Sequence, residues 1–185
     1  MRSTLAIPVL FASLAFLGGT AMAEDTVPNP EYQNWSSFKV GASATLAMTS
    51  QSGETTTTTK MTTKLLELTE EKAVVETAMS MNVGGKDMEM PAQKRDVPAK
   101  VAKTEPSKEA PPKTTEGDED VTVGDQKIAC HWVEVTIKND TMTMTSKTWT
   151  SKSVPGGTVK MESTTDMSGT KSTTKSMLTS FTTGA

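Results

Sequence analysis

Apolar side chains fall on every second position along much of this chain. Between residues 38 and 49, for example, the alternate positions are occupied by Val40, Ala42, Ala44, Leu46 and Met48. This period of two is the pattern of a half-buried β-strand. Further strands are expected at residues 54–68, 73–83, 86–90, 121–123, 126–138, 141–151, 159–167 and 170–181. The sequence therefore predicts a mainly β protein.

Turn residues separate these expected strands. Gly84-Gly85 and Asn139-Asp140 are suited to tight hairpins, and Pro155 followed by Gly156 is suited to a type II turn. The chain is only 35% hydrophobic, and much of that fraction lies near its start, so the core should be thin. We expect a single strongly curved antiparallel sheet, a half-barrel or a barrel-like sheet, rather than two thick packed layers.

One short N-terminal helix precedes the strands. Asn29 is a favourable N-cap, Pro30 suits the first helical position, and Glu31 places an acid in the first turn. The helix is expected to run from Pro30 to about Ser37. No other segment has clear helical signals.

Residues 91–120 differ in composition from the rest of the chain. They contain several prolines, alternating charges and very few apolar side chains. Such a segment buries too little apolar surface to offset the entropy lost on ordering. We therefore expect a long disordered loop here, inserted into a single β domain that spans residues 24–185.

Residues 1–23 have the features of a secretory signal peptide. Arg2 precedes an apolar run from Leu5 to Leu17, and Ala21 and Ala23 form a small-residue cleavage pattern. The run is short for a bilayer span, and no second such run follows, so the mature chain is not expected to span a membrane. We expect an exported bacterial protein, periplasmic or extracellular.

Charge and motifs remove several classes of function. The formal net charge is −3 and no basic patch is present, which argues against a nucleic-acid partner. The chain has no GxGxxG, P-loop, GxSxG or HExxH pattern. Its acidic residues cluster in turns and in residues 91–120, apart from scattered ones such as Glu134 and Glu162. We therefore expect no enzyme activity and no cofactor.

The segment IACHWVEVTI holds the only cysteine and the only histidine of the chain, Cys130 and His131. Neighbouring side chains on a strand point to opposite faces, so these two cannot form a catalytic dyad. The face that carries Ala129, His131, Val133, Val135 and Ile137 is expected to be the core. His131 should then be a neutral, hydrogen-bonded core residue. Cys130 should be buried or paired with a second chain.

Methionines recur in the pattern Met-x-Met, at residues 79–81, 88–90 and 142–144. Each pair lies on one face of its strand, where it can fill gaps in a thin core or line an apolar cleft. If a groove exists, Trp132, Trp149, Met142 and Met144 are the candidate ligand-binding residues. A sharper alternative is a Cu(I) site formed by His131, Met142 and Met144, because thioethers and imidazole suit that ion.

Several segments resemble a group of uncharacterised exported bacterial proteins. They are NPEYQNWSSFKVGA, KLLELTEEKAVVE, and a cysteine strand CHWVEV followed by KTWTSKSVPGGTVKMES, which contains the W-x-S-x-x-VPGG hairpin. The arrangement is also similar to lipoprotein-carrier-like (LolA-like) half-barrels. That resemblance implies a concave apolar face able to hold a lipid-like molecule. Such folds cover the cavity with helices, whereas only one short helix is expected here.

Three functions remain open at this point. The first is a non-enzymatic exported protein that binds an apolar, lipid-like ligand or an envelope partner on a curved sheet. The second is a periplasmic Cu(I)-binding protein. The third is a structural envelope module without a ligand.

Overall fold

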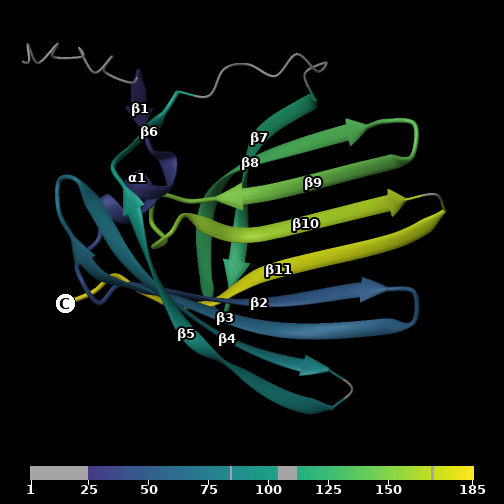
Figure 1. The fold of residues 1–185 in the computed structure, drawn as a ribbon, viewed down its shortest axis with the longest axis horizontal. Helices are drawn as coiled ribbons and strands as arrows, with labels where there is room; N and C mark the ends of the chain where they lie inside the picture. The colour runs from purple at the N-terminus through teal and green to yellow at the C-terminus, as the bar shows by residue number, and fades with distance from the viewer. Residues whose placement is uncertain (1–24, 84, 104–111, 168) are drawn as a thin grey trace, which may run out of the picture.

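The computed structural model describes residues 25–83, 85–103, 112–167 and 169–185 (Figure 1). The predicted signal peptide, residues 1–23, lies outside these ranges. The described ranges contain one helix and eleven strands: β1 (Thr26–Pro28), α1 (Pro30–Ser36), β2 (Ser43–Ser52), β3 (Thr55–Leu68), β4 (Lys72–Val83), β5 (Lys86–Pro98), β6 (Lys100–Ala102), β7 (Lys113–Val123), β8 (Gln126–Lys138), β9 (Met142–Thr150), β10 (Thr158–Met167) and β11 (Thr170–Thr182).

Nine of these strands form one antiparallel sheet in the order β5-β4-β3-β2-β11-β10-β9-β8-β7. Two series of hairpins, β2 to β5 and β7 to β11, meet in the middle where β2 pairs with β11. The prediction of a mainly β protein with a single antiparallel sheet and one short helix is confirmed. Among the described residues, no helix is long and apolar enough to cross a bilayer.

The expected strong curvature and barrel-like closure are wrong. The sheet is open, because its outermost strands β5 and β7 do not pair with each other. Both edge strands are polar: β5 contains KDMEMPAQKRDVP and β7 contains KTTEGDEDVTV. Charged side chains along an edge disfavour further strand pairing, so the two edges remain separate.

The disordered insertion expected at residues 91–120 is also wrong over most of its length. The second half of β5, all of β6 and most of β7 lie within it, and residues 104–111 are outside the described ranges. Of the side chains on β5, only Val97 is buried. Strand β5 is held by backbone hydrogen bonds to β4, and such bonds form whether the side chains are polar or apolar. Pro91 falls at the register shift of that ladder, where a missing N–H is tolerated.

The predicted N-terminal helix is confirmed as α1. The side chain of Asn29 accepts a hydrogen bond of 3.0 Å from the backbone N–H of Glu31, and Pro30 starts the helix. The amide of Asn29 also donates to the carbonyl of Pro98 at 2.7 Å, which fixes the helix to the end of β5. The small sheet of β1 and β6 adds a second connection at the same place.

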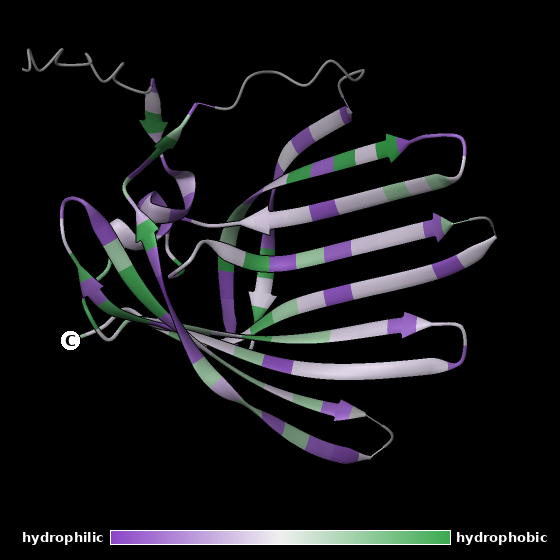
Figure 2. Cartoon of the chain, viewed as in Figure 1, coloured by the Kyte–Doolittle hydropathy of each residue, from purple (hydrophilic) through white to green (hydrophobic). Residues whose placement is uncertain are grey.

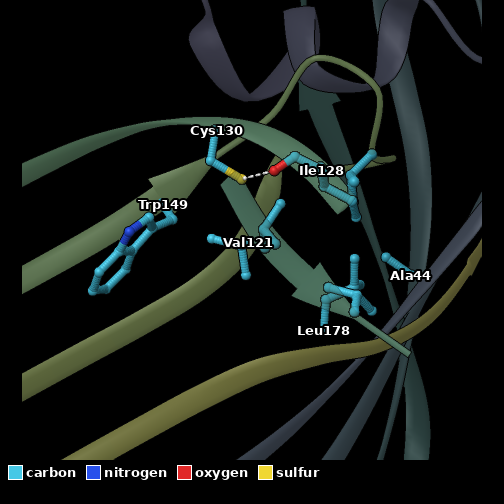
Figure 3. Close-up of a cluster of buried hydrophobic side chains, with 9 residues drawn as sticks. Ala44, Val121, Ile128, Cys130, Trp149 and Leu178 are labelled. Atoms are coloured by element: carbon cyan, nitrogen blue, oxygen red, sulfur yellow. Dashed lines mark hydrogen bonds between the residues drawn. The ribbon is translucent and has the colours of Figure 1, made fainter. Parts of the chain in front are cut away.

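The buried apolar side chains form two clusters near the end of the sheet at which α1 lies. Figure 2 shows hydrophobic residues at this end and also on the distal part of β8. The first contains Trp35 of α1 with Ala42, Leu65, Ala73, Val75 and Val97. The second contains Ala44, Val121, Val123, Ile128, Cys130, Trp149, Val154, Val159 and Leu178 (Figure 3). Further from α1, the outer parts of β2, β3, β10 and β11 are mostly threonine and serine, residues that favour a pleated surface.

The turn at residues 154–157 packs directly on α1. The backbone N–H of Gly156 donates to the carbonyl of Asn34 at 3.1 Å, and Val154 is fully buried. Gly156 has a φ of 76°, and a Cβ added there would lie 2.9 Å from a ring carbon of Trp35. Glycine is therefore required for two reasons, the left-handed backbone and the close approach of the indole.

Replacement of this glycine should separate the two effects. Gly156→Ala should destabilise the protein by about 1–3 kcal/mol more than Gly124→Ala, because only the first methyl collides with a neighbour. Gly124 also has a positive φ, of 57°, but has no atom within 4 Å of an added Cβ. Urea unfolding of both variants measures the difference. Equal losses would show that the Trp35 contact adds nothing to the requirement for glycine.

Candidate functional site

The registers of the nine-stranded sheet place its methionines on one side. Directly paired residues of neighbouring strands share a face, and successive residues alternate between faces. One row across the sheet, from β8 to β5, consists of Val133, Thr148, Met161, Ser176, Met48, Thr59, Met81 and Met88. The next row towards α1 consists of Leu178, Leu46, Met61, Met79 and Met90. We call this side the methionine face.

The remaining Met-x-Met pair lies on the same side. Met144 pairs with Ile137 and Thr165, and Met142 pairs with Met167, in rows that continue the methionine face towards the strand tips. Within the described strands, every methionine except Met177 is on this face. The three Met-x-Met pairs of the sequence, from β4, β5 and β9, therefore form one surface.

The middle of the methionine face is shielded and its borders are open. Thr59 and Ser176 are buried, while Met48, Met61, Met81 and Met161 are half-buried. Met88 on the edge strand and Met167 near a strand tip are exposed. The central side chains are thus covered largely by their neighbours in the sheet.

Helix α1 and the turn after β9 close one end of the methionine face. A hollow of about 120 Å³ lies between them and the sheet, and Trp35, Leu46, Met61 and Pro155 are among its lining residues. Glu31 of α1 and Arg95 of β5 form a bidentate ion pair beside it. The apolar rows therefore cross the strands between a wall formed by α1 at one end of the sheet and the open strand tips at the other.

The opposite side, which we call the charged face, carries residues of alternating sign. One row consists of Glu134, Lys147, Glu162 and Lys175 on β8 to β11, and the next consists of Thr136, Thr145, Thr164 and Thr173. Opposite charges directly across a ladder attract, and paired threonines fit a solvated sheet surface. This solvated face accounts for part of the threonine content of β8 to β11, whereas Thr59 and Thr148 lie on the methionine face.

Two of the four predicted ligand-binding residues, Trp132 and Trp149, lie on the charged face. They are direct partners on β8 and β9. The ammonium of Lys147 lies 3.8 Å from the centre of the Trp132 ring, and that of Lys160 lies 4.3 Å from the centre of the Trp149 ring. The indole N–H of Trp149 donates to the carboxylate of Glu119 on β7. Both indoles are therefore engaged by the protein itself.

Trp132 also presses on the edge strand. A Cβ at Gly117 of β7, its direct partner, would lie only 2.8 Å from the indole. Met142 and Met144, the other two predicted residues, are on the methionine face. The structure thus divides the predicted set between the two sides of the sheet.

The predicted Cu(I) ligand set is wrong. His131 pairs with Thr150, whereas Met144 pairs with Ile137, at the far end of β8. At about 3.3 Å per residue, this separates the imidazole position from Met144 by about 20 Å, too far for a common ion. The sequence around Met142 and Met144 does not contain the register between β8 and β9, so this separation could not be predicted from it.

His131 is not the buried core residue that its strand pattern suggested. Its side chain is 46% exposed, and its Nδ1 lies 3.0 Å from a carboxylate oxygen of Asp118. The other face of β8 is buried at this end, because Ile128 and Cys130 pack with Val121 of β7 against the second cluster (Figure 3). The choice of core face was wrong for this half of the strand.

Cys130 is 4% exposed, so of the two states expected for it the structure shows the buried one. Its Sγ donates to the carbonyl of Ile128 at 3.3 Å. Burial is the main cause that raises the pKa of this thiol, and the carboxylates of Asp120 and Glu119 raise it further. The thiolate that a nucleophile requires is therefore disfavoured.

A broad, open hollow of about 970 Å³ lies beside His131. Its lining residues include Asn34, Asp118, Asp120, Cys130, His131 and Lys152. In the part of the chain that the structure describes, no group of three or more His, Cys, Asp or Glu side chains is arranged to hold a metal ion. The absence of enzyme activity remains a prediction.

Comparison with models of protein families gave no match, and comparison with curated proteins gave none either. The resemblance to an exported bacterial group and to lipoprotein-carrier-like half-barrels therefore remains a prediction. Sequence reasoning recognised each Met-x-Met pair but missed that pairs from separate hairpins share one face. The missing information was the register of every strand pair between them.

The state of the Cys130 thiol can be measured in two ways. Labelling with a thiol reagent should be slow in the native protein and fast in urea. The folded protein favours the neutral thiol of Cys130. The stabilisation that results is complete below about pH 8.5, the usual pKa of cysteine, and is lost as pH rises through the higher pKa of the folded state. The free energy of unfolding should fall more steeply between about pH 8.5 and 10 than in Cys130→Ala. Identical slopes together with rapid native labelling would contradict this account.

Proposed function

We propose that this chain is an exported, non-enzymatic protein that binds an apolar, lipid-like molecule on the methionine face. The observation that supports this most directly is that the three Met-x-Met pairs lie on one side of the sheet while β8 to β11 carry alternating charges on the other. Carboxylates on the methionine side, such as Glu116 and Asp118, belong to the edge strand β7. A sheet without a partner for its less polar side leaves that side available for a ligand.

Methionine is suited to this purpose. Its side chain is unbranched and polarisable, so a surface rich in methionine adapts to apolar molecules of different shape. The serine and threonine residues between the methionines offer hydroxyl groups to a polar head. An elongated ligand would lie across the strands, along the row of Met48 and Met161.

A structural module that docks an envelope protein is the second candidate. It is supported by the hollows of the structure. The hollow under α1 has only about 120 Å³ and the hollow of about 970 Å³ beside His131 is open, whereas sites for drug-sized molecules usually enclose about 300–1,000 Å³. A flat partner surface needs no enclosed cavity. The two candidates differ in whether the isolated protein binds small apolar molecules.

A charge placed on the methionine face should distinguish them. Met48→Lys should abolish binding of the neutral dye phenylnaphthylamine, because an ammonium in the middle row is costly to cover with an apolar ligand. Ala47→Lys is the matched control, since Ala47 precedes Met48 on β2 and points to the charged face. Fluorescence titration of both variants measures the effect. Equal loss in both variants would contradict a site on the methionine face.

Native mass spectrometry of protein purified from its own cellular compartment tests the ligand directly. We expect an apolar molecule to co-purify with the wild-type chain and to be absent from Met48→Lys. Recovery of the wild-type chain without any such molecule, together with no dye binding, would refute the apolar-ligand proposal and favour the structural module.

A further inference from the structure

We propose that the β4–β5 hairpin binds a soft monovalent metal ion, Cu(I) or Ag(I), through the thioether sulfurs of Met79, Met81, Met88 and Met90. This goes beyond the apolar-ligand proposal. The site uses a different ligand set from the one that contained His131.

The register brings the four thioethers together. Met79 is paired directly with Met90, and Met81 is paired directly with Met88. The Cβ atoms of such pairs are about 4.5–5.5 Å apart, and all four side chains project from the methionine face. Met61 of β3 is paired with Met79 and brings a fifth sulfur to the edge of the group.

The turn of the hairpin fixes this register from the other side of the sheet. The amide of Asn82 donates to a carboxylate oxygen of Asp87 at 2.7 Å, and its carbonyl oxygen accepts from the N–H of Gly85 at 3.2 Å. A slip of one residue would turn one Met-x-Met pair to the charged face. The polar contacts of the turn therefore keep both pairs on the same side.

The hairpin is accessible to an ion. Strand β5 is an edge of the nine-stranded sheet. Its Met88 and Met90 are 51% and 42% exposed, whereas Met79 and Met81 on β4 are half-buried. The inner pair can hold an ion that enters from the edge, and the outer pair can close over it.

The donor type determines which ion is bound. Thioethers are soft, uncharged donors that select Cu(I) among the metals of the cell, and Ag(I) has similar preferences. Zn²⁺, Mg²⁺ and Ca²⁺ prefer nitrogen, thiolate or oxygen donors. Methionine side chains are flexible enough for several sulfurs to turn towards one ion.

Anaerobic titration of the mature protein with Cu(I), in competition with a chromophoric Cu(I) chelator, tests the site. We expect one ion per chain. The fourfold variant Met79→Leu, Met81→Leu, Met88→Leu and Met90→Leu should lose this binding. The matched control changes Met142, Met144, Met161 and Met167 to Leu, on the same face but on β9 and β10, and should retain it.

A second measurement locates the ion. In the wild-type protein, one equivalent of Ag(I) should shift the NMR signals of the methionine methyl groups of the β4–β5 hairpin and leave those of β9 and β10 in place. Thioethers carry no titratable proton, so Cu(I) affinity should be unchanged between about pH 5 and 8, unlike that of an imidazole or thiol site. Cys130→Ala and His131→Ala should both bind Cu(I) as the wild type does.

Several results would overturn the proposal. These are the absence of Cu(I) binding, equal loss in the two fourfold variants, or loss on removal of Cys130.

Leucine is close to methionine in volume, so the variants should remain folded, and urea unfolding checks this. If the fourfold variant is unfolded, the exposed Met88→Leu alone should weaken binding, and unchanged affinity would count against the site. The fourfold hairpin variant should still bind the dye, so failure of this proposal is separable from failure of the apolar-ligand proposal.

Discussion

The pairing of β2 with β11 is the contact on which the rest of the sheet depends. It joins two hairpin series that begin and end far apart in the chain, and it sets one series in register with the other. Because side chains alternate along a strand, a shift of one residue at this ladder would move the methionines of β3 to β5 to the face opposite those of β9 and β10. The common methionine face depends on this register together with the registers inside each hairpin series.

The same register separates two kinds of chemistry. On one side, thioethers and hydroxyls form a surface that can meet an apolar molecule or a soft ion. On the other side, Glu134, Lys147, Glu162 and Lys175 alternate in charge, and Trp132 and Trp149 are covered by lysines. Tryptophan, the residue most suggestive of a ligand site in the sequence, thus serves to fasten β7 and β8, and the less conspicuous methionines are left available.

Packing is concentrated at one end of the molecule. Helix α1, the turn at residues 154–157 and the first half of β8 cover the apolar clusters there, while the outer parts of the strands rely mainly on their ladders. This explains how a chain with few large apolar residues forms a sheet of nine strands. It also explains how β5, with one buried side chain, is ordered in spite of a composition typical of disorder.

The sequence by itself determined the element types, most strand limits, the capped helix at Pro30, and the fact that Cys130 and His131 point apart, because these follow from alternation and local turn chemistry. It predicted an insertion at residues 91–120 and a buried His131, and both were wrong, since backbone pairing and the packing of β8 are not local properties. Only the tertiary structure decided which Met-x-Met pairs share a face and which edges stay open. Those features depend on the registers between strands distant in the chain, and no single segment contains that information.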